Sequence, residues 1–146
     1  MPLFHPKVDS DVVKMLEKVP IFASLTERQL RSLAKDTYGR VYKEGESVVK
    51  QGEKGIGFFL ILDGGVEVRK DGRRVASLST GDFFGEMALF REQPRTADVV
   101  AVRPTRCLVL SRWEFWGFAA DNARLLRGMM EVIVRRLGDT SKALSE

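Results

Sequence analysis

Glu86 and Arg95 are the side chains whose types and spacing best suit the binding of an anion. They stand nine residues apart in segment 81–97, which reads Gly-Asp-Phe-Phe-Gly-Glu-Met-Ala-Leu-Phe-Arg-Glu-Gln-Pro-Arg-Thr-Ala. A short helix is predicted at Glu86–Leu89, and the unpaired N–H groups at its start suit an anionic oxygen. Arg95 adds a charge-assisted clamp, and Glu86 can accept a hydrogen bond from a hydroxyl. The set indicates the ribose phosphate of a nucleotide, although an internal Glu86–Arg95 ion pair explains it equally well.

Residue types for other chemistries are scarce. His5 is the single histidine and Cys107 the single cysteine. Zinc and non-haem iron sites collect three or four His, Cys or carboxylate ligands, so we expect no metal site and no cupin-type metalloenzyme. We expect a solvated His5 in the N-terminal tail and a buried Cys107 in a strand. Catalysis by carboxylates alone stays open, but no pattern indicates it, and we predict that the chain is not an enzyme.

Cysteine usage and hydropathy bear on the compartment. One cysteine cannot form an internal disulfide, which is typical of a reducing cytoplasm. The N-terminus lacks the basic and apolar regions of a signal peptide. No apolar run approaches the roughly 20 residues that span a bilayer. We therefore expect a cytoplasmic protein without membrane contact.

The basic residues are spread evenly along the chain. The 24 Lys and Arg and 20 Asp and Glu give a net charge of +4. Residues 1–50, 51–110 and 111–146 each hold a small basic excess, and no run of five like charges occurs. A surface that follows a phosphate backbone needs concentrated Lys and Arg, so we expect no direct nucleic-acid binding.

Three regions are predicted to position segment 81–97. Residues 9–37 show helical spacing, with Pro20 ending a first helix and Thr26 capping a second helix three residues before Gln29. Residues 38–110 contain short alternating strands and turns, including an Asp71-Gly72 hairpin. No crossover helix interrupts these strands, which predicts a mainly antiparallel jelly roll, a double-stranded β-helix, flanked by helices.

Residues 111–146 are predicted to be helical and to end in a long helix. Its apolar residues at spacings of 4, 3, 4, 3 and 4 form a heptad seam: Leu126, Met130, Ile133, Leu137, Thr140 and Leu144. A second apolar row lies beside it: Leu125, Met129 and Val132. Two rows favour packing on the barrel and on the same helix of a second chain, which predicts a homodimer. The alternative, in which the two rows form one wide apolar stripe buried within a monomer, stays open. The aromatics that precede this helix are expected to cap the barrel core, with a ligand cage as the alternative: Trp113, Phe115, Trp116 and Phe118.

Segment 81–97 resembles the phosphate-binding cassette of cyclic nucleotide-binding domains. The matching residues are Phe84-Gly85-Glu86-Met87-Ala88-Leu89 and Pro94-Arg95-Thr96-Ala97. Upstream motifs match that family's strands in the same order: Gly45-Glu46, Gln51-Gly52-Glu53, Phe59–Leu62 and Gly65-Val66-Glu67-Val68. The resemblance covers roughly residues 12–144. The spacing of Glu86 and Arg95 is similar to that of kinase regulatory subunits and channel domains.

The resemblance implies a ligand-binding set of seven residues: Gly85, Glu86, Met87, Ala88, Arg95, Thr96 and Ala97. In this interpretation Arg95 pairs with the exocyclic phosphate oxygens and Glu86 accepts the ribose 2′-hydroxyl. Main-chain N–H groups around Gly85 complete the site, and no metal or cofactor is required. Thr96 lies beside the phosphate and base, with Ala97 allowing close approach.

The last helix is similar to that of the bacterial cyclic AMP receptor branch of the family. Arg136, Thr140 and Ser141 would then close the site and contact the base, the serine across a dimer. The alternative is that Thr140 is only a polar break in the heptad seam and that Ser141 faces solvent. Thr140 and Ser141 favour cyclic AMP, whereas a hydroxyl at Thr96 leaves cyclic GMP open. That branch continues into a DNA-binding domain, which is not expected here because the chain stops at Glu146; a stand-alone sensor and an excised piece both fit.

The sequence thus predicts one domain over residues 1–146. Its parts are a tail at 1–8, helices at 9–37, a β-barrel at 38–110 with the cassette at 81–97, and helices at 111–146. The predicted function is a non-enzymatic cyclic nucleotide sensor whose ligand moves the C-terminal helix. The alternative is a docking or dimerisation module that keeps the fold without the ligand.

Overall fold

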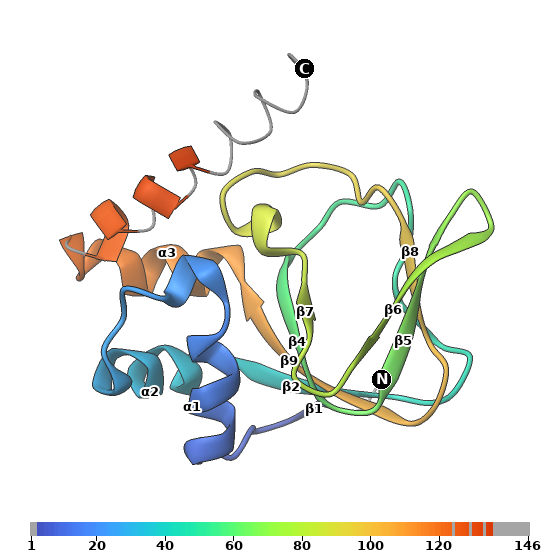
Figure 1. The fold of residues 1–146 in the computed structure, drawn as a ribbon, viewed down its shortest axis with the longest axis horizontal. Coiled ribbons are helices and arrows are strands. Elements are labelled where there is room, and N and C mark those ends of the chain that lie inside the picture. Colours follow the sequence, from blue (N-terminus) through green and yellow to red (C-terminus); the bar gives the residue numbers. More distant parts are fainter. Residues whose placement is uncertain (1–2, 124, 129, 133, 136–146) are drawn as a thin grey trace.

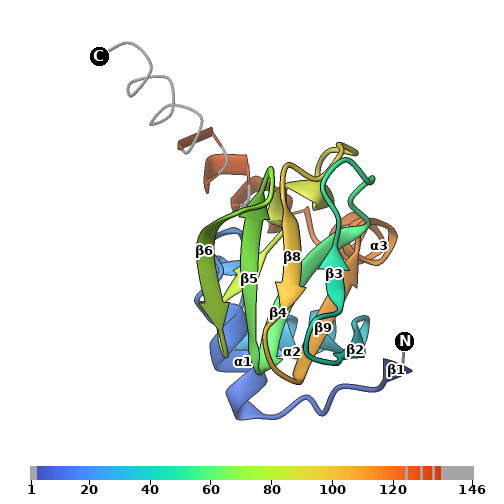
Figure 2. The same cartoon turned by 90° about the vertical axis from the view of Figure 1, so that its right-hand side faces the viewer.

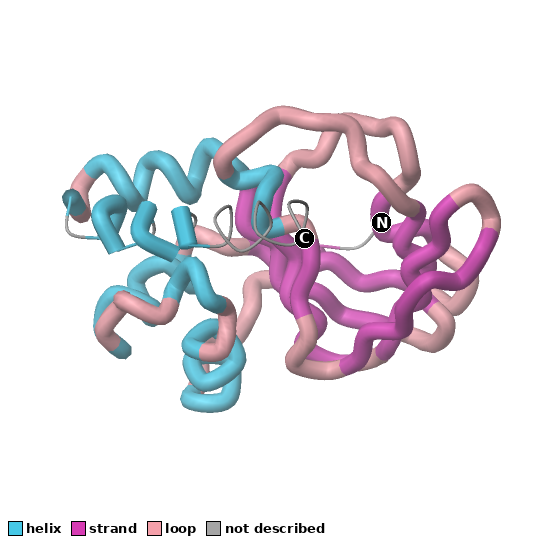
Figure 3. Tube along the Cα trace, turned by 45° about the horizontal axis from the view of Figure 1, so that its top comes forward, coloured by secondary structure: helices cyan, strands magenta, loops and turns pink. Residues whose placement is uncertain are grey.

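The strands and helices occupy opposite parts of the molecule. A computed structural model describes residues 3–123, 125–128, 130–132 and 134–135 of the chain (Figure 1). Figure 3 shows the helices gathered at one end and the strands at the other, with the short helix of the cassette between them. In the part of the chain that the structure describes, no helix is long and apolar enough to cross a membrane.

Side-chain caps mark the starts of two of the three N-terminal helices. The three helices are α1 (Ser10–Glu17), η1 (Pro20–Phe22) and α2 (Glu27–Lys35). Asp9 caps α1 by accepting from the Val12 N–H, and Thr26 forms a reciprocal capping box with Gln29 at the start of α2. Apolar faces of both helices are buried, which confirms the expected helical layer.

The strands form two antiparallel sheets, which confirms the predicted jelly roll (Figure 2). The five-stranded sheet has the order β1-β2-β9-β4-β7 and the four-stranded sheet the order β3-β8-β5-β6. The strands are β1 (Leu3–Phe4), β2 (Tyr38–Tyr42), β3 (Ser47–Val49), β4 (Gly57–Asp63), β5 (Gly65–Lys70), β6 (Arg73–Ser79), β7 (Phe83–Phe84), β8 (Asp98–Ala101) and β9 (Thr105–Ser111). The hairpin between β5 and β6 turns at Asp71 and Gly72, both with positive φ, as the Asp-Gly signal predicts.

Strand β4 separates two apolar cores. Phe58 and Leu60 belong to the core shared with α1, α2 and the C-terminal helices. Phe59 and Ile61 point the other way, into the core between the two sheets. Because successive side chains of a strand face opposite sides, a strand buried on both faces must be apolar throughout. The uninterrupted apolar run of β4 follows from this position.

The C-terminal region continues from β9 into helix α3 (Arg112–Ala120). Residues described between 123 and 135 are helical as well, and Leu125 is buried in the helical core. Met130, on the predicted seam, is 63% exposed. Packing of one row on the domain's own core is therefore confirmed at Leu125. The seam residues Ile133, Leu137, Thr140 and Leu144, and Met129 of the second row, lie outside the described residues.

Two residues of the expected tail at 1–8 form a strand, β1, instead. Leu3 and Phe4 pair antiparallel with Arg40 and Gly39 of β2. A Cβ on Gly39 would lie 2.3 Å from Phe4 Cζ, so the ring occupies the space left by the missing side chain. Two residues are too few for an alternation pattern, and their partners lie 35 and 37 residues further along the chain. The remaining predicted tail residues precede α1.

Candidate functional site

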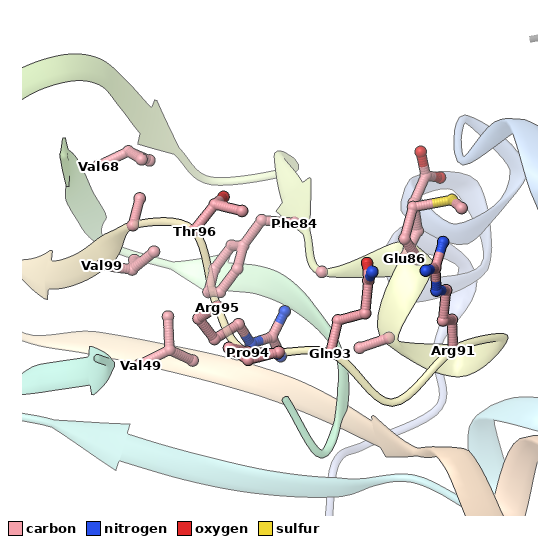
Figure 4. A pocket seen from close by; sticks show the side chains of 14 residues that line it. Val49, Val68, Phe84, Glu86, Arg91, Gln93, Pro94, Arg95, Thr96 and Val99 are labelled. Carbon is pink, nitrogen blue, oxygen red and sulfur yellow. The ribbon is translucent and has the colours of Figure 1, made fainter. Parts of the chain in front are cut away.

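A pocket of about 290 Å³ lies between the short helix η2 (Glu86–Leu89) and the strands β3, β5, β7 and β8 (Figure 4). Its lining residues are Val49, Val68, Phe84, Gly85, Glu86, Met87, Ala88, Arg91, Gln93, Pro94, Arg95, Thr96, Ala97 and Val99. All seven residues that the resemblance assigns to the ligand are among them. The structure thus brings together the two halves of the cassette, which the sequence separates by six residues.

Gly85 determines how the cassette enters η2. Its φ of 79° lies in the left-handed region, which favours glycine. A Cβ on Gly85 would also lie 2.4 Å from Arg95 Nη1 and 2.8 Å from the Gly57 carbonyl oxygen. The predicted short helix is confirmed as a 3-10 helix, in which the Ala88 N–H donates to the Gly85 carbonyl over 3.1 Å. Glycine is therefore required both for the turn and for the close approach of Arg95.

Arg95 is held by a main-chain carbonyl and by stacked aromatic rings. Its Nη2 donates to the Gly57 carbonyl oxygen over 2.7 Å. The guanidinium carbon lies 5.7 Å from the centroid of the Phe59 ring, which stacks on Phe84 at 5.0 Å. A Cβ on Gly55 would come within 2.8 Å of Arg95 Nε, so a larger residue there would displace the side chain. These contacts fix the arginine at the floor of the pocket.

The charge of Arg95 is balanced by no carboxylate in the described ion pairs. Burial lowers the pKa of Arg95, because desolvation disfavours the charged guanidinium. Its Nε is buried and has no hydrogen-bond partner among the described residues. The ion pairs of the described residues do not include the alternative, an internal Glu86–Arg95 pair. A half-buried guanidinium beside a pocket can donate charge-assisted hydrogen bonds to an anion bound there.

The main chain of Arg95 is anchored to the loop that follows β3. Its N–H donates to the Glu53 carbonyl over 2.7 Å, and its carbonyl accepts from Gly52 over 2.8 Å. A third bond joins Gly55 to the Gln93 carbonyl over 3.2 Å. These bonds explain why the motif around Gly52 accompanies the cassette, since it positions the cassette's arginine.

Helix α3 (Arg112–Ala120) holds the C-terminal end of η2. The Trp116 indole donates to the Leu89 carbonyl over 2.7 Å, and Arg112 Nη1 donates to the Ala88 carbonyl over 3.2 Å. Phe90 packs edge-on against Phe115 and Trp116. Phe115 and Phe118 belong to the helical core and Trp116 covers η2, whereas Trp113 is 68% exposed. The expected cap thus lies on the helical core rather than on the core between the two sheets, and none of these aromatics lines the pocket.

The other predicted side chains differ in exposure. Glu86 and Ala97 are half-buried, Ala88 is buried, and Thr96 is exposed. Met87 is 48% exposed at the pocket edge. The further predicted contacts Arg136, Thr140 and Ser141 lie outside the described residues. Within the residues that the structure describes, no cluster of His, Cys, Asp or Glu could hold a metal ion.

Sequence reasoning missed the apolar wall of the pocket and two polar residues at its mouth. Val49, Val68 and Val99 come from β3, β5 and β8. Alternation assigns such valines to an inward face, but only the pairing of β8 with both β3 and β5 brings them together. Arg91 and Gln93 lie within the cassette, and their side-chain types were the available signal.

Comparison with known families gives a match over most of the barrel. The profile described as "Cyclic nucleotide-binding domain" matches residues 39–122. The matched stretch contains the whole cassette and every residue lining the pocket.

Two curated relatives are protein kinases or their subunits. A cGMP-dependent protein kinase, isozyme 1, of Drosophila melanogaster is 33% identical over 141 residues, 91% of this chain and 17% of the relative. A cAMP-dependent protein kinase regulatory subunit of Mycosarcoma maydis is 41% identical over 96 residues, 63% of this chain and 18% of the relative. The chain therefore spans less than a fifth of the length of either relative.

Two solved structures share the fold. The cAMP-bound structure of PfPKA-R has a TM-score of 0.68 and 28% identity, over 91% of this chain and 45% of that chain. The catabolite activator protein of Thermus thermophilus has a TM-score of 0.71 and 28% identity, over 86% of this chain and 62% of that chain. The likeness extends to both branches that the cassette and the last helix resemble.

Proposed function

The chain belongs to the family of cyclic nucleotide-binding domains, and from this membership we propose that it is a sensor that binds cyclic AMP in the pocket lined by η2 and Arg95. One observation carries the proposal. Arg95 presents a half-buried guanidinium to the pocket, held by Gly57 and balanced by no carboxylate in the described ion pairs. A cyclic phosphate diester carries one negative charge, which this cation can match without a metal.

In this proposal the seven cassette residues bind different parts of the ligand. Arg95 pairs with the exocyclic phosphate oxygens, and the main chain of Gly85 and Met87 lies against the phosphate. Ala88 and Ala97, which are small, let the backbone approach closely. Glu86 accepts the ribose 2′-hydroxyl as a charge-assisted hydrogen bond. The three inward valines, Val49, Val68 and Val99, offer an apolar wall to the base.

The base is assigned to adenine over guanine. The cAMP-bound PfPKA-R structure and the Mycosarcoma maydis regulatory subunit support cyclic AMP. The Drosophila relative is a cGMP-dependent kinase, so cyclic GMP is the competing ligand. Thr96 is the described residue whose hydroxyl can hydrogen-bond a guanine, and it lines the pocket. In the proposed sensor Arg136, Thr140 and Ser141 close the site and favour adenine.

Ligand binding is proposed to move the C-terminal helix through α3. Arg112 and Trp116 of α3 hydrogen-bond the carbonyls of Ala88 and Leu89, at the end of η2. A shift of the cassette around a phosphate therefore changes the contacts of α3, and α3 leads directly into the last helix. The ligand can select one helix position only by its difference in affinity for the two arrangements.

The proposal also covers the oligomeric state of the protein and its location in the cell. Residues 1–146 act as a single, non-enzymatic domain in the cytoplasm, and the C-terminal helix joins two copies. The exposed Met130, five residues after the buried Leu125, supports an apolar face left for a second chain. Sedimentation equilibrium tests the dimer: Met130→Glu is expected to give monomers, while Val75→Glu, at another exposed apolar residue, leaves the mass unchanged.

Thermal unfolding with cyclic AMP or cyclic GMP tests the ligand. Ligand at about 100 times its dissociation constant adds roughly 2.7 kcal/mol, a Tm shift on the order of 5–11 °C. The shift is expected with cyclic AMP and should disappear in Arg95→Leu but persist in Arg74→Leu, at an exposed residue outside the pocket. No shift with either nucleotide at millimolar concentration would favour the alternative, a docking module without a ligand.

A further inference from the structure

Arg91 places a second cation at the mouth of the pocket. Its side chain lines the same pocket as Arg95 but is exposed, whereas Arg95 is half-buried. Figure 4 shows the Gln93 side chain between the two arginines, with Arg91 on the side of Glu86. The two cations therefore differ in depth: one lies at the floor and the other at the rim.

Gln93 fixes the orientation of Arg91. With its amide oxygen turned to the guanidinium, Gln93 accepts hydrogen bonds from Arg91 Nη2 and Nε, both at 3.1 Å. The backbone of Gln93 is itself bound to Gly55, and the following Pro94 bridges to Lys54. A guanidinium held by two bonds to an anchored residue has less rotational freedom than an unrestrained surface arginine.

The neighbouring acidic residue is engaged by other cations. Glu92 lies 3.5 Å from Lys54 Nζ and 4.0 Å from Arg112 Nη2. Its charge is thereby shared with two other residues, while Arg91 turns to the neutral Gln93.

Arg91 adds a positive charge to the pocket. Among the described residues that line it, the charged side chains are Glu86, Arg91 and Arg95. Replacing Arg91 by a neutral residue lowers the charge of this described set by one. A cyclic mononucleotide is a monoanion, so the rim arginine supplies the field that attracts it.

We infer that Arg91, oriented by Gln93, is a steering residue that accelerates entry of the anionic nucleotide, while Arg95 retains it. The inference rests on the proposed function and adds a residue to it. Rim charges act mainly on association rates and their salt dependence, whereas buried charge pairs act mainly on dissociation. Substitution of Arg91 should therefore change mainly the association rate, and substitution of Arg95 mainly the dissociation rate.

Stopped-flow binding of a fluorescent cyclic AMP analogue to the full chain measures both rates. Ionic strengths of about 10 mM and about 150 mM correspond to screening lengths of about 30 Å and 8 Å. At low salt Arg91→Gln is expected to lower the association rate about three- to tenfold and leave dissociation within about twofold. The difference should shrink at the higher salt. Arg91→Lys, which keeps the charge, should restore most of the rate.

Two variants act as comparisons. Arg74→Gln makes the same charge change at an exposed residue of β6 outside the pocket and should leave association at the wild-type rate. Gln93→Ala keeps both charges but frees Arg91, so it should slow association less than Arg91→Gln and more than Arg74→Gln.

Each outcome separates the inference from the proposed function. If Arg91→Gln slows association no more than Arg74→Gln, or acts on dissociation instead, the steering role is wrong while cyclic nucleotide binding stands. An unchanged rate in Gln93→Ala overturns the orienting role of Gln93. If the wild-type chain binds neither cyclic AMP nor cyclic GMP, the proposed function fails and steering fails with it.

Discussion

The indole N–H of Trp116 donates to the Leu89 carbonyl over 2.7 Å and joins α3 to the last residue of η2. Helix η2 has only four residues, so its terminal carbonyls depend on partners outside it. Arg112 provides another such bond, to Ala88. Helix η2 is therefore held at its start by Gly85 and at its end by α3.

Replacing Trp116 by Phe removes this bond and keeps an aromatic ring. We expect the free energy of unfolding to fall by about 1 kcal/mol, because the Leu89 carbonyl loses its donor. Urea denaturation measures the loss. Trp113→Phe is the control, since Trp113 is 68% exposed and packs against Arg112, and it should cost less. Equal losses in the two variants would contradict a specific role for the Trp116 bond.

Replacing Gly85 by Ala tests the close approach of Arg95. Both Gly85 and Gly81 have positive φ, so alanine costs about 1–2 kcal/mol of backbone strain at either position. A Cβ on Gly81 meets nothing within 4 Å, whereas one on Gly85 meets Arg95 Nη1. We expect Gly85→Ala to weaken cyclic AMP binding more than tenfold in calorimetry, about 1.4 kcal/mol. Gly81→Ala, equally strained, should bind nearly as the wild type does.

The contact between Phe4 and Gly39 should appear as a coupling energy. Gly39→Ala forces the Phe4 ring away and is expected to destabilise the domain by about 1 kcal/mol. In a Phe4→Ala background the space is empty, and the same change should be almost neutral. A double-mutant cycle by urea denaturation should give a coupling of at least about 0.5 kcal/mol. Additive effects would mean that β1 is not packed on β2 in solution.

Alkaline pH should destabilise the domain through two buried groups. Burial raises the pKa of Cys107 from 9.0 to about 12 and that of Tyr42 from 10.0 to about 12. Folded-state values above the unfolded ones give stability that is complete below about pH 9 and is lost as pH rises towards about 12. The loss should reach about 1–2 kcal/mol near pH 10. Urea denaturation at several pH values gives the free energy of unfolding as a function of pH. Between about pH 9 and pH 12 this free energy should fall less steeply in Cys107→Ala/Tyr42→Phe than in the wild type, and an equally steep fall would contradict this origin.

Local signals predicted those parts of the fold that depend on neighbouring residues. The capping box of Thr26 and Gln29 and the turn at Asp71 and Gly72 need no distant partner. Strand β2 has no such marker, since Tyr38–Tyr42 mixes half-buried and buried positions between a helix and a turn. Its pairing with β9, over 60 residues away in the chain, supplies the missing stabilisation.

The candidate site was predictable in composition but not in full extent. Gly85, Glu86 and Arg95 are recognisable because their types and spacing resemble a known cassette. The valine wall is not, because valine is the ordinary residue of any buried strand. The role of Gly57 was also hidden, since its contribution to Arg95 is a main-chain carbonyl that any residue type possesses.

The sequence by itself determined the antiparallel barrel, its flanking helices and the chemistry of the cassette, because alternation, capping and side-chain type are local properties. Only the tertiary structure decided which groups surround Arg95, where Phe4 packs, and that Arg91 shares a pocket with Glu86. These relationships depend on strand pairing and on the space left between packed elements. Neither quantity is carried by the spacing of residues along the chain.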